Sequence, residues 1–303
     1  MGETISPTLP VRGVGRRVRG SSRTLLYGRR FMRNGPAVGG LVFFLALVAF
    51  AVFGGKLVPW SYSDIDFSSL GKPPSATHWF GTTQVGTDMF AMVAHGLGRS
   101  LIIAITVSAL TLLIGAFLGA LAAYLGGRPE AVILGIINFL LACPAFLLTA
   151  IIAQKTGGNW VMLIGVLTLF GWMVMGRVIW QLSTSIRERD FVSAARFMGV
   201  KGHVVVFRHI VPNIGSLLVV QFTLGIVTTV MSETALSFLG FGIKIPDVSL
   251  GSLLTAGQTL LMTTPWAFWF PAGALLLLTL SVGFMADGLR DALDPNSAAG
   301  GKA

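Results

Sequence analysis

Long apolar stretches alternate with short polar segments along most of the chain, and this pattern predicts membrane-spanning helices. A helix needs about 20 apolar residues to cross a hydrocarbon core of about 30 Å. Six segments are long enough or nearly so: Ala37–Val58, Ser100–Leu125, Ala131–Gln154, Trp160–Gly176, Ile214–Gly240 and Ala267–Ala286. We therefore expect an all-α transmembrane fold with six spans.

The composition agrees with this expectation. Of 303 residues, 53% are hydrophobic and only 11% are charged, whereas a soluble domain carries about 25% charged residues. The single cysteine, Cys143, lies in an apolar stretch, so the sequence supports neither an intrachain disulfide nor a thiolate metal site. We expect an integral membrane protein rather than two soluble domains.

The positions of the basic residues indicate how the chain is oriented. With six spans, 17 of the 22 lysines and arginines fall on the face that holds both termini. Because positive residues stay in the cytoplasm, we expect both termini to be cytoplasmic. The net charge of +10 then reflects topology and contact with anionic lipid, not binding to nucleic acid.

The predicted spans divide the chain into five regions. Residues 1–36 form a basic cytoplasmic tail, 37–58 the first span, and 59–98 an extracytoplasmic loop with Pro73 and Pro74. Residues 99–287 form a core of five spans with a charged cytoplasmic segment at 187–212, and 288–303 form a C-terminal tail. No internal repeat is strong enough to propose.

Several sequence signatures of catalysis and of self-sufficient transport are missing. The sequence has no GxxxxGK[ST] loop and no HExxH, and its four histidines are dispersed. Glu233 is the one acidic residue deep within a predicted span, whereas ion-driven carriers usually need several such groups. We expect no enzymatic activity, no metal and no cofactor. Energy for uphill transport must then enter from another chain. A secondary carrier and a membrane scaffold or sensor remain alternatives.

The charged segment between the fourth and fifth spans has the pattern of a short docking helix. Asp190 suits the N-cap, and Phe191, Ala195 and Met198 fall at i, i+4 and i+7 on one predicted face. Gly199 suits the left-handed position that closes a helix. An amphipathic loop lying on the lipid surface is the alternative.

This segment resembles the EAA motif of permease subunits in binding-protein-dependent ABC importers. That motif has EAA, three further residues, glycine, and an ending of hydrophobic residues and proline. The matching positions are Ser193, Ala194, Ala195, Gly199, Ile210, Val211 and Pro212. Ser193 stands where the motif has glutamate, so any salt bridge of that glutamate is missing here.

Three further stretches resemble the C-type permease of the oligopeptide/dipeptide branch. Residues 78–88 are similar to HxFGTDxxGRD, with Thr83 and Thr87 in place of Asp and Arg. Residues 237–242 match SFLGxG, and residues 286–295 follow GDGLRDALDP almost letter for letter. The resemblance covers roughly residues 28–296.

The resemblance implies a six-span type I ABC importer permease in the prokaryotic plasma (inner) membrane. Its expected partners are a second six-span permease, two ATP-binding subunits and an extracytoplasmic substrate-binding protein. The expected substrates are oligopeptides or dipeptides, with nickel chelates and haem precursors as alternatives in the same branch. The expected ATPase contact comprises Phe191, Ser193, Ala194, Ala195, Met198, Gly199 and Pro212.

Polar residues within spans are candidates for the translocation cavity. These are Glu233, Asn138 and Gln221, for which hydrogen bonding between helices is the alternative. Gly115, Gly119 and Ala123 form a strip of small residues that favours close helix packing. At the inner end of the last span, four charged residues fall at i, i+3, i+4 and i+7, where pairing or solvation are both open: Asp287, Arg290, Asp291 and Asp294.

Overall fold

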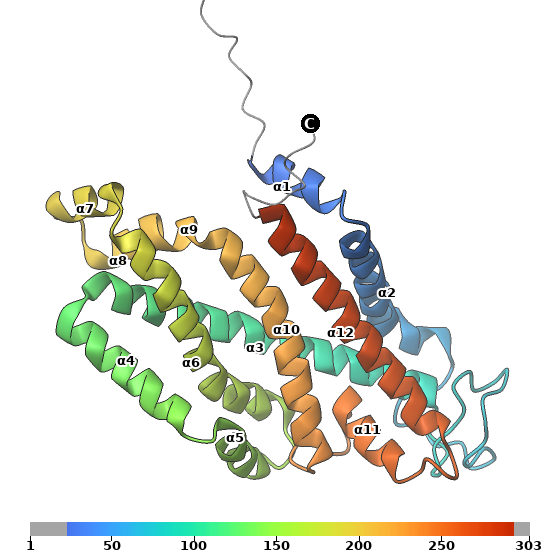
Figure 1. Ribbon diagram of the computed structural model, residues 1–303. Coiled ribbons are helices and arrows are strands. Elements are labelled where there is room, and N and C mark those ends of the chain that lie inside the picture. The colour runs from blue at the N-terminus through green and yellow to red at the C-terminus, as the bar shows by residue number, and fades with distance from the viewer. Residues whose placement is uncertain (1–22, 294–303) are drawn as a thin grey trace, which may run out of the picture.

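The computed structural model describes residues 23–293, which form helices joined by loops with two isolated β-bridges (Figure 1). The elements are α1 (Arg23–Phe31), α2 (Gly35–Leu57), α3 (Met89–Leu125), α4 (Gly127–Ala142), α5 (Ala145–Gln154), α6 (Trp160–Arg187), α7 (Asp190–Phe197), α8 (Gly202–Val205), the π-helix η1 (Val206–Ile210), α9 (Val211–Asn213), α10 (Gly215–Phe238), α11 (Leu250–Gln258) and α12 (Trp266–Leu293).

Within this described part, five helices are long and apolar enough to cross a membrane: α2, α3, α6, α10 and α12. Helices α4 and α5 meet the criterion only as a pair, with a bend of 75° between them. The chain is therefore a multi-pass membrane protein with five or six spans.

The second span begins earlier than its sequence predicts. Helix α3 starts at Met89, not Ser100, because Asp88 caps it by accepting the Ala91 amide hydrogen at 2.8 Å. The polar residues His95 and Arg99 favour a loop in a prediction from sequence. In the structure, the side chains of both residues pair with Asp247. The start of α3 thus lies within the expected loop of residues 59–98, and α3 is about 55 Å long at 1.5 Å per residue.

The third expected span is not one straight helix. Helix α4 ends at Ala142, and Pro144 precedes α5. Proline lacks an amide hydrogen and its ring clashes with the preceding turn, which explains the bend at this point.

Helix α6 continues beyond the expected end at Gly176 to Arg187. In its polar last turns, the Thr184 and Ser185 hydroxyls donate to the backbone carbonyls of Trp180 and Leu182. Two helices were not expected at all: α1 lies inside the predicted tail, and α11 lies between the last two spans.

Helices α3 and α6 pack closely through glycine. A Cβ atom at Gly119 would overlap the carbonyl oxygen of Gly176, and one at Gly115 would lie 2.8 Å from the Gly176 nitrogen. Ala123 is fully buried. The expected role of this strip in close helix packing is confirmed.

The C-terminal helix ends against the N-terminal part of the chain. Asp291 accepts a hydrogen bond from Asn34 Nδ2 at 3.2 Å, and Gly288 lies directly against Ala37. Asp294, which was expected to join a charge cluster here, lies outside the described residues.

The two ends of the bundle are built differently (Figure 1). Helices α1, α7, α8 and α9 gather at one end, here called the α7 end. The loop of residues 58–88, α5 and α11 lie at the opposite end, here called the α11 end. At the α11 end, Trp266 donates to the Thr82 carbonyl at 2.9 Å, so the loop is fastened to the start of α12.

Candidate functional site

Helix α7 forms the predicted short helix in the charged segment, from Asp190 to Phe197. It ends as its sequence indicates: Gly199 has a φ of +73°, and the Val200 amide donates to the Ala195 carbonyl at 3.1 Å. A hydrogen bond from the residue after a left-handed glycine to a carbonyl five residues earlier is the Schellman motif, which ends many helices. No atom lies within 4 Å of a Cβ placed on Gly199, so backbone conformation alone selects glycine there.

The orientation of α7 differs from the expected one. Ala195 is buried with Val192 in a core shared with α3, α6, α8 and η1. Phe191, in contrast, is 39% exposed and Met198 is 75% exposed. The prediction that Ala195 lies on one face with these two residues is therefore wrong.

Part of the exposed surface of α7 and of the residue that follows it is apolar. It comprises Phe191, Ala194, Phe197 and Met198, and the Phe197 side chain is 92% exposed. Ser193 is half-buried at its edge. We call these four exposed residues the α7 face. An exposed apolar surface of this kind is typical of a contact with another protein or with the membrane surface.

Pro212 lies farther along the segment, in α9, where the chain turns into α10. Between α7 and α10 the chain passes through α8 and the π-helix η1, and Val205, Val206 and Ile210 are fully buried. The whole segment is therefore packed against the ends of the spans rather than suspended from them.

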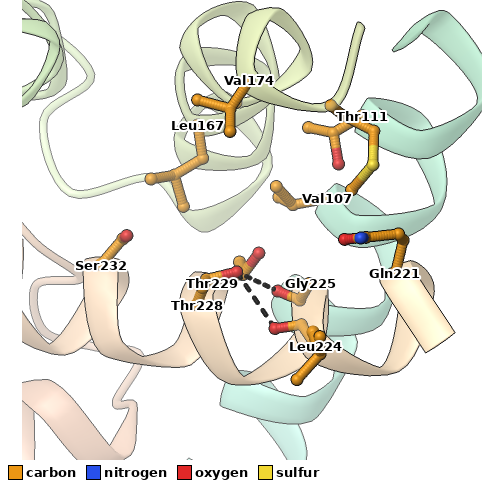
Figure 2. A pocket seen from close by; sticks show the side chains of 12 residues that line it. Val107, Thr111, Leu167, Val174, Gln221, Leu224, Gly225, Thr228, Thr229 and Ser232 are labelled. Atoms are coloured by element: carbon orange, nitrogen blue, oxygen red, sulfur yellow. Dashed lines mark hydrogen bonds between the residues drawn. The ribbon is translucent and has the colours of Figure 1, made fainter. Parts of the chain in front are cut away.

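A pocket of about 320 Å³ lies between α3, α6 and α10 (Figure 2). Its polar lining comes from Thr111 of α3 and from Gln221, Thr228, Thr229 and Ser232 of α10. Aliphatic side chains of α3 and α6 form most of the rest.

The polar groups of α10 follow one helical face. Gln221, Gly225, Thr228 and Ser232 fall at i, i+4, i+7 and i+11, and all four line the pocket. They lie along the middle of α10. Polar groups at this depth of a span typically face a water-filled cavity or the bundle interior. We call this row the α10 stripe.

Glu233 lies outside this pocket. It is 1% exposed, and its Oε1 atom accepts hydrogen bonds from Ser249 Oγ at 2.6 Å and Ser237 Oγ at 2.7 Å. Ser249 also accepts the amide hydrogen of Ser252 at 3.1 Å, which caps α11. Glu233 thus fastens α11 to α10, in line with the alternative of hydrogen bonding between helices.

Asn138 is also away from the pocket. It is exposed on α4 and accepts a hydrogen bond from Arg177 Nη1 of α6 at 3.0 Å. Of the three polar residues expected in a cavity, the structure places only Gln221 in the pocket. Sequence periodicity along α10 could have identified Thr228 and Ser232, because they share the face of Gln221.

Residues 78–88, at the α11 end, form a compact turn around a buried histidine, His78. His78 Nδ1 lies 2.8 Å from Asp88 Oδ2, and Nε2 lies 3.4 Å from Asp66 Oδ2. Hydrogen bonds from the Ser68 hydroxyl and amide lower the pKa of Asp66. Since Asp88 also caps α3, the histidine ties the loop to the start of that helix.

A second polar cluster at the α11 end joins four segments. Asp247 accepts from Arg99 Nη2 at 2.7 Å and lies 2.8 Å from His95 Nε2. Tyr62 stacks on His95 at 3.7 Å, and the Arg99 guanidinium lies 4.3 Å from the Trp160 ring centre. Partial burial alone would raise the pKa of Asp247, but the hydrogen bonds from His95 and Arg99 outweigh it and lower the pKa.

Two family models match separate regions of the chain. The model described as "Binding-protein-dependent transport system inner membrane component" matches residues 115–297. The model described as "N-terminal TM domain of oligopeptide transport permease C" matches residues 26–74. The first of these regions includes α7 and the pocket-lining residues of α6 and α10.

Similar proteins cover nearly the whole chain. The oligopeptide transport system permease protein OppC of Mycobacterium tuberculosis (strain ATCC 25618 / H37Rv) is 40% identical over 279 residues, covering 91% of this chain and 96% of that protein. A putative peptide permease protein of Brucella suis biovar 1 is 38% identical, covering 88% and 89%. The OppC protein of Bacillus subtilis (strain 168) is 32% identical, covering 88% and 87%. With two family models matched and identities of this size over almost its full length, the chain belongs to the binding-protein-dependent transport system inner membrane components, as a C-type permease of the oligopeptide/dipeptide branch.

Proposed function

We propose that this chain is one of two permease subunits of an ATP-driven importer of peptides. The proposed substrate class, peptides, is based on the relatives of the chain. About nine-tenths of its length is similar to proteins named as oligopeptide or peptide permeases. Nickel chelates and haem precursors remain the alternative substrates. The chain itself performs no catalysis, since ATP is bound and hydrolysed by two partner subunits. An extracytoplasmic binding protein delivers the substrate.

In this proposal the α7 end faces the cytoplasm and the α11 end faces outward. The α7 end carries basic residues such as Arg187, Arg189, Lys201 and Arg208, which favour the cytoplasmic side. The bent α4–α5 pair then counts as one span. This gives six spans in a plasma membrane and places both termini in the cytoplasm.

The α7 face is the proposed ATPase contact. Phe191, Ala194, Phe197 and Met198 enter a cleft of one ATP-binding subunit, Ser193 lies at the rim, and Gly199 closes the helix. Ala195 and Pro212 act indirectly: Ala195 packs α7 onto the spans, and Pro212 directs the chain into α10. The observation that carries this assignment is the exposed apolar face on a helix that is otherwise packed against the spans.

The α10 stripe is the proposed lining of the translocation path. A second permease would close the open side of the pocket between α3, α6 and α10, so that peptide passes along hydroxyl and amide groups. When the ATPases close, the segment from α7 to α9 moves α6 and α10 together. This switches the access of the pocket from one side to the other.

Cysteine cross-linking tests the ATPase contact. In a Cys143→Ser background, Met198→Cys should form a disulfide with a cysteine placed in the cleft of the ATP-binding subunit encoded with this permease. A cysteine in place of Met262, which is 97% exposed at the α11 end, is the matched control and should not cross-link. Equal cross-linking at both positions would contradict the proposed contact.

A further inference from the structure

A polar cluster at the α7 end joins three spans at the point where α7 begins. Glu130, in the first turn of α4, accepts hydrogen bonds from Trp180 Nε1 at 2.6 Å and from Arg187 Nη1 at 3.4 Å. Arg187 Nη1 also donates to the Ala123 carbonyl of α3 at 2.9 Å. We call these groups the corner cluster. It connects α3, α4 and α6 through one carboxylate and one guanidinium.

The corner cluster is partly shielded from solvent. The side chains of Arg187 and Glu130 are 24% and 17% exposed, so water screens their attraction less than that of a surface pair. Gly126 makes room for it. This residue turns the chain between α3 and α4 with a φ of +65°, and a Cβ there would lie 3.2 Å from Arg187 Nη1.

The corner cluster is also continuous with α7. Arg187 is the last residue of α6, and only two residues separate it from Asp190. Those two residues are held by the backbone: the Arg189 amide donates to Ile186, and the amides of Val192 and Ser193 donate to Arg189. Because hydrogen bonds hold the backbone between α6 and α7, a displacement of α7 should also displace Arg187.

We propose that Glu130 and Arg187 are positioning residues that transmit the movement of α7 to the corner between α3 and α4. In this proposal, the ATPase contacts the α7 face, and the movement of α7 displaces the end of α6. The hydrogen bonds of Glu130 and Arg187 hold that end of α6 to α3 and α4, so the two neighbouring helices move with it. This inference rests on the proposed function, because it assumes that an ATPase moves α7. Its residues lie outside both the α7 face and the α10 stripe.

The test uses the complete importer in proteoliposomes: this permease with the second permease, the two ATPases and the binding protein encoded beside it. Glu130→Gln keeps an acceptor for Trp180 but removes the ion pair, and Arg187→Met removes both donated hydrogen bonds. Each variant should still assemble with the ATPases and hydrolyse ATP at the basal rate. The number of peptides moved per ATP hydrolysed should fall by about fivefold or more.

Three companion variants separate transmission from folding. Arg187→Lys can still donate to the Ala123 carbonyl and to Glu130, so it should keep the wild-type number of peptides moved per ATP. The double variant should be no worse than either single one, because both break the same link. Arg128→Gln removes an exposed charge two positions before Glu130 and should leave the ratio unchanged.

The possible outcomes are distinguishable. If Glu130→Gln and Arg187→Met keep the wild-type ratio of peptides per ATP, or lose only protein yield, the positioning role is overturned while the proposed function stands. If the wild-type permease does not bind ATPases or does not couple, the proposed function itself fails. A reduced ratio with intact assembly, rescued by Arg187→Lys, supports the positioning role.

Discussion

At the scale of single residues, backbone conformation and hydrogen-bond partners set the role of each group. Gly199 is required by a positive φ with open space around it, so the sequence pattern was sufficient to predict it. Ala195 and Glu233 were not predictable in the same way. The direction in which Ala195 points depends on α3 and α6, and the partners of Glu233 come from Ser237 and a distant Ser249.

Replacing Gly199 by valine should weaken the closure of α7 and uncouple ATP hydrolysis from uptake. A β-branched side chain at φ +73° is strained by about 1–2 kcal/mol. Transport assays in membrane vesicles, together with quantification of inserted protein, would measure this. Gly215→Val is the control, since that glycine also has open space but no positive φ. Normal uptake by the Gly199 variant would count against the role of α7.

Glu233 should tolerate glutamine but not leucine. The amide oxygen of Gln can still accept from Ser237 and Ser249, whereas leucine leaves both buried hydroxyls without their acceptor, at about 1–3 kcal/mol. Thermal unfolding in detergent should therefore show a lower Tm for Glu233→Leu alone. Glu233→Gln should transport the same range of peptides as the wild type, while Gln221→Leu in the α10 stripe should change that range. If Glu233→Gln transported a different range of peptides, Glu233 would have to be placed in the translocation path.

Acid should weaken the cluster around Asp247. Because the pKa of this carboxyl is lower in the folded protein, its contribution to stability is full above the unfolded pKa and is lost as pH falls through the folded one. Asp247→Asn should cost roughly 1 kcal/mol at neutral pH. The Tm difference from wild type should shrink in acid, and exposed Asp287→Asn serves as the control. A difference that stays constant with pH would be inconsistent with this assignment.

At the scale of helices, the lengths of the apolar stretches predicted the candidate membrane spans. The strip of small residues, Gly115, Gly119 and Ala123, predicted the close packing of one helix pair, α3 and α6. Helix ends were predicted less well. The first turns of α3 read as loop because His95 and Arg99 find their partner 148 or more positions away, at Asp247. The α4–α5 bend follows from Pro144, but the direction in which the chain leaves a proline depends on packing, not on local sequence.

The α3–α6 seam should not accept side chains. Gly119→Val would force its branched side chain into the backbone of α6 at Gly176, and such overpacking costs about 1–3 kcal/mol or more. Gly165→Val on α6 is the comparison, because no atom lies within 4 Å of its Cβ position. Only the Gly119 variant should show a lower Tm and reduced yield of folded protein. Equal stability of the two variants would mean that the helices can separate without penalty.

At the scale of the whole molecule, the two ends of the bundle differ in construction. The α7 end carries an exposed apolar face joined directly to α6, while the α11 end is fastened by polar clusters around His78, Asp247 and Glu233. The pocket is lined by residues from the middle of α10 and from α3 and α6 (Figure 2). In our proposal, such an arrangement moves substrate only when another subunit moves the α7 end.

Accumulation of a labelled peptide in proteoliposomes tests this dependence most directly. The chain reconstituted alone should accumulate no peptide against a gradient, even with ATP or an ion gradient present. Addition of the second permease, the ATPases, the binding protein and ATP should produce uptake that ceases when ATP is replaced by a non-hydrolysable analogue. Uphill accumulation by the chain alone would contradict the account.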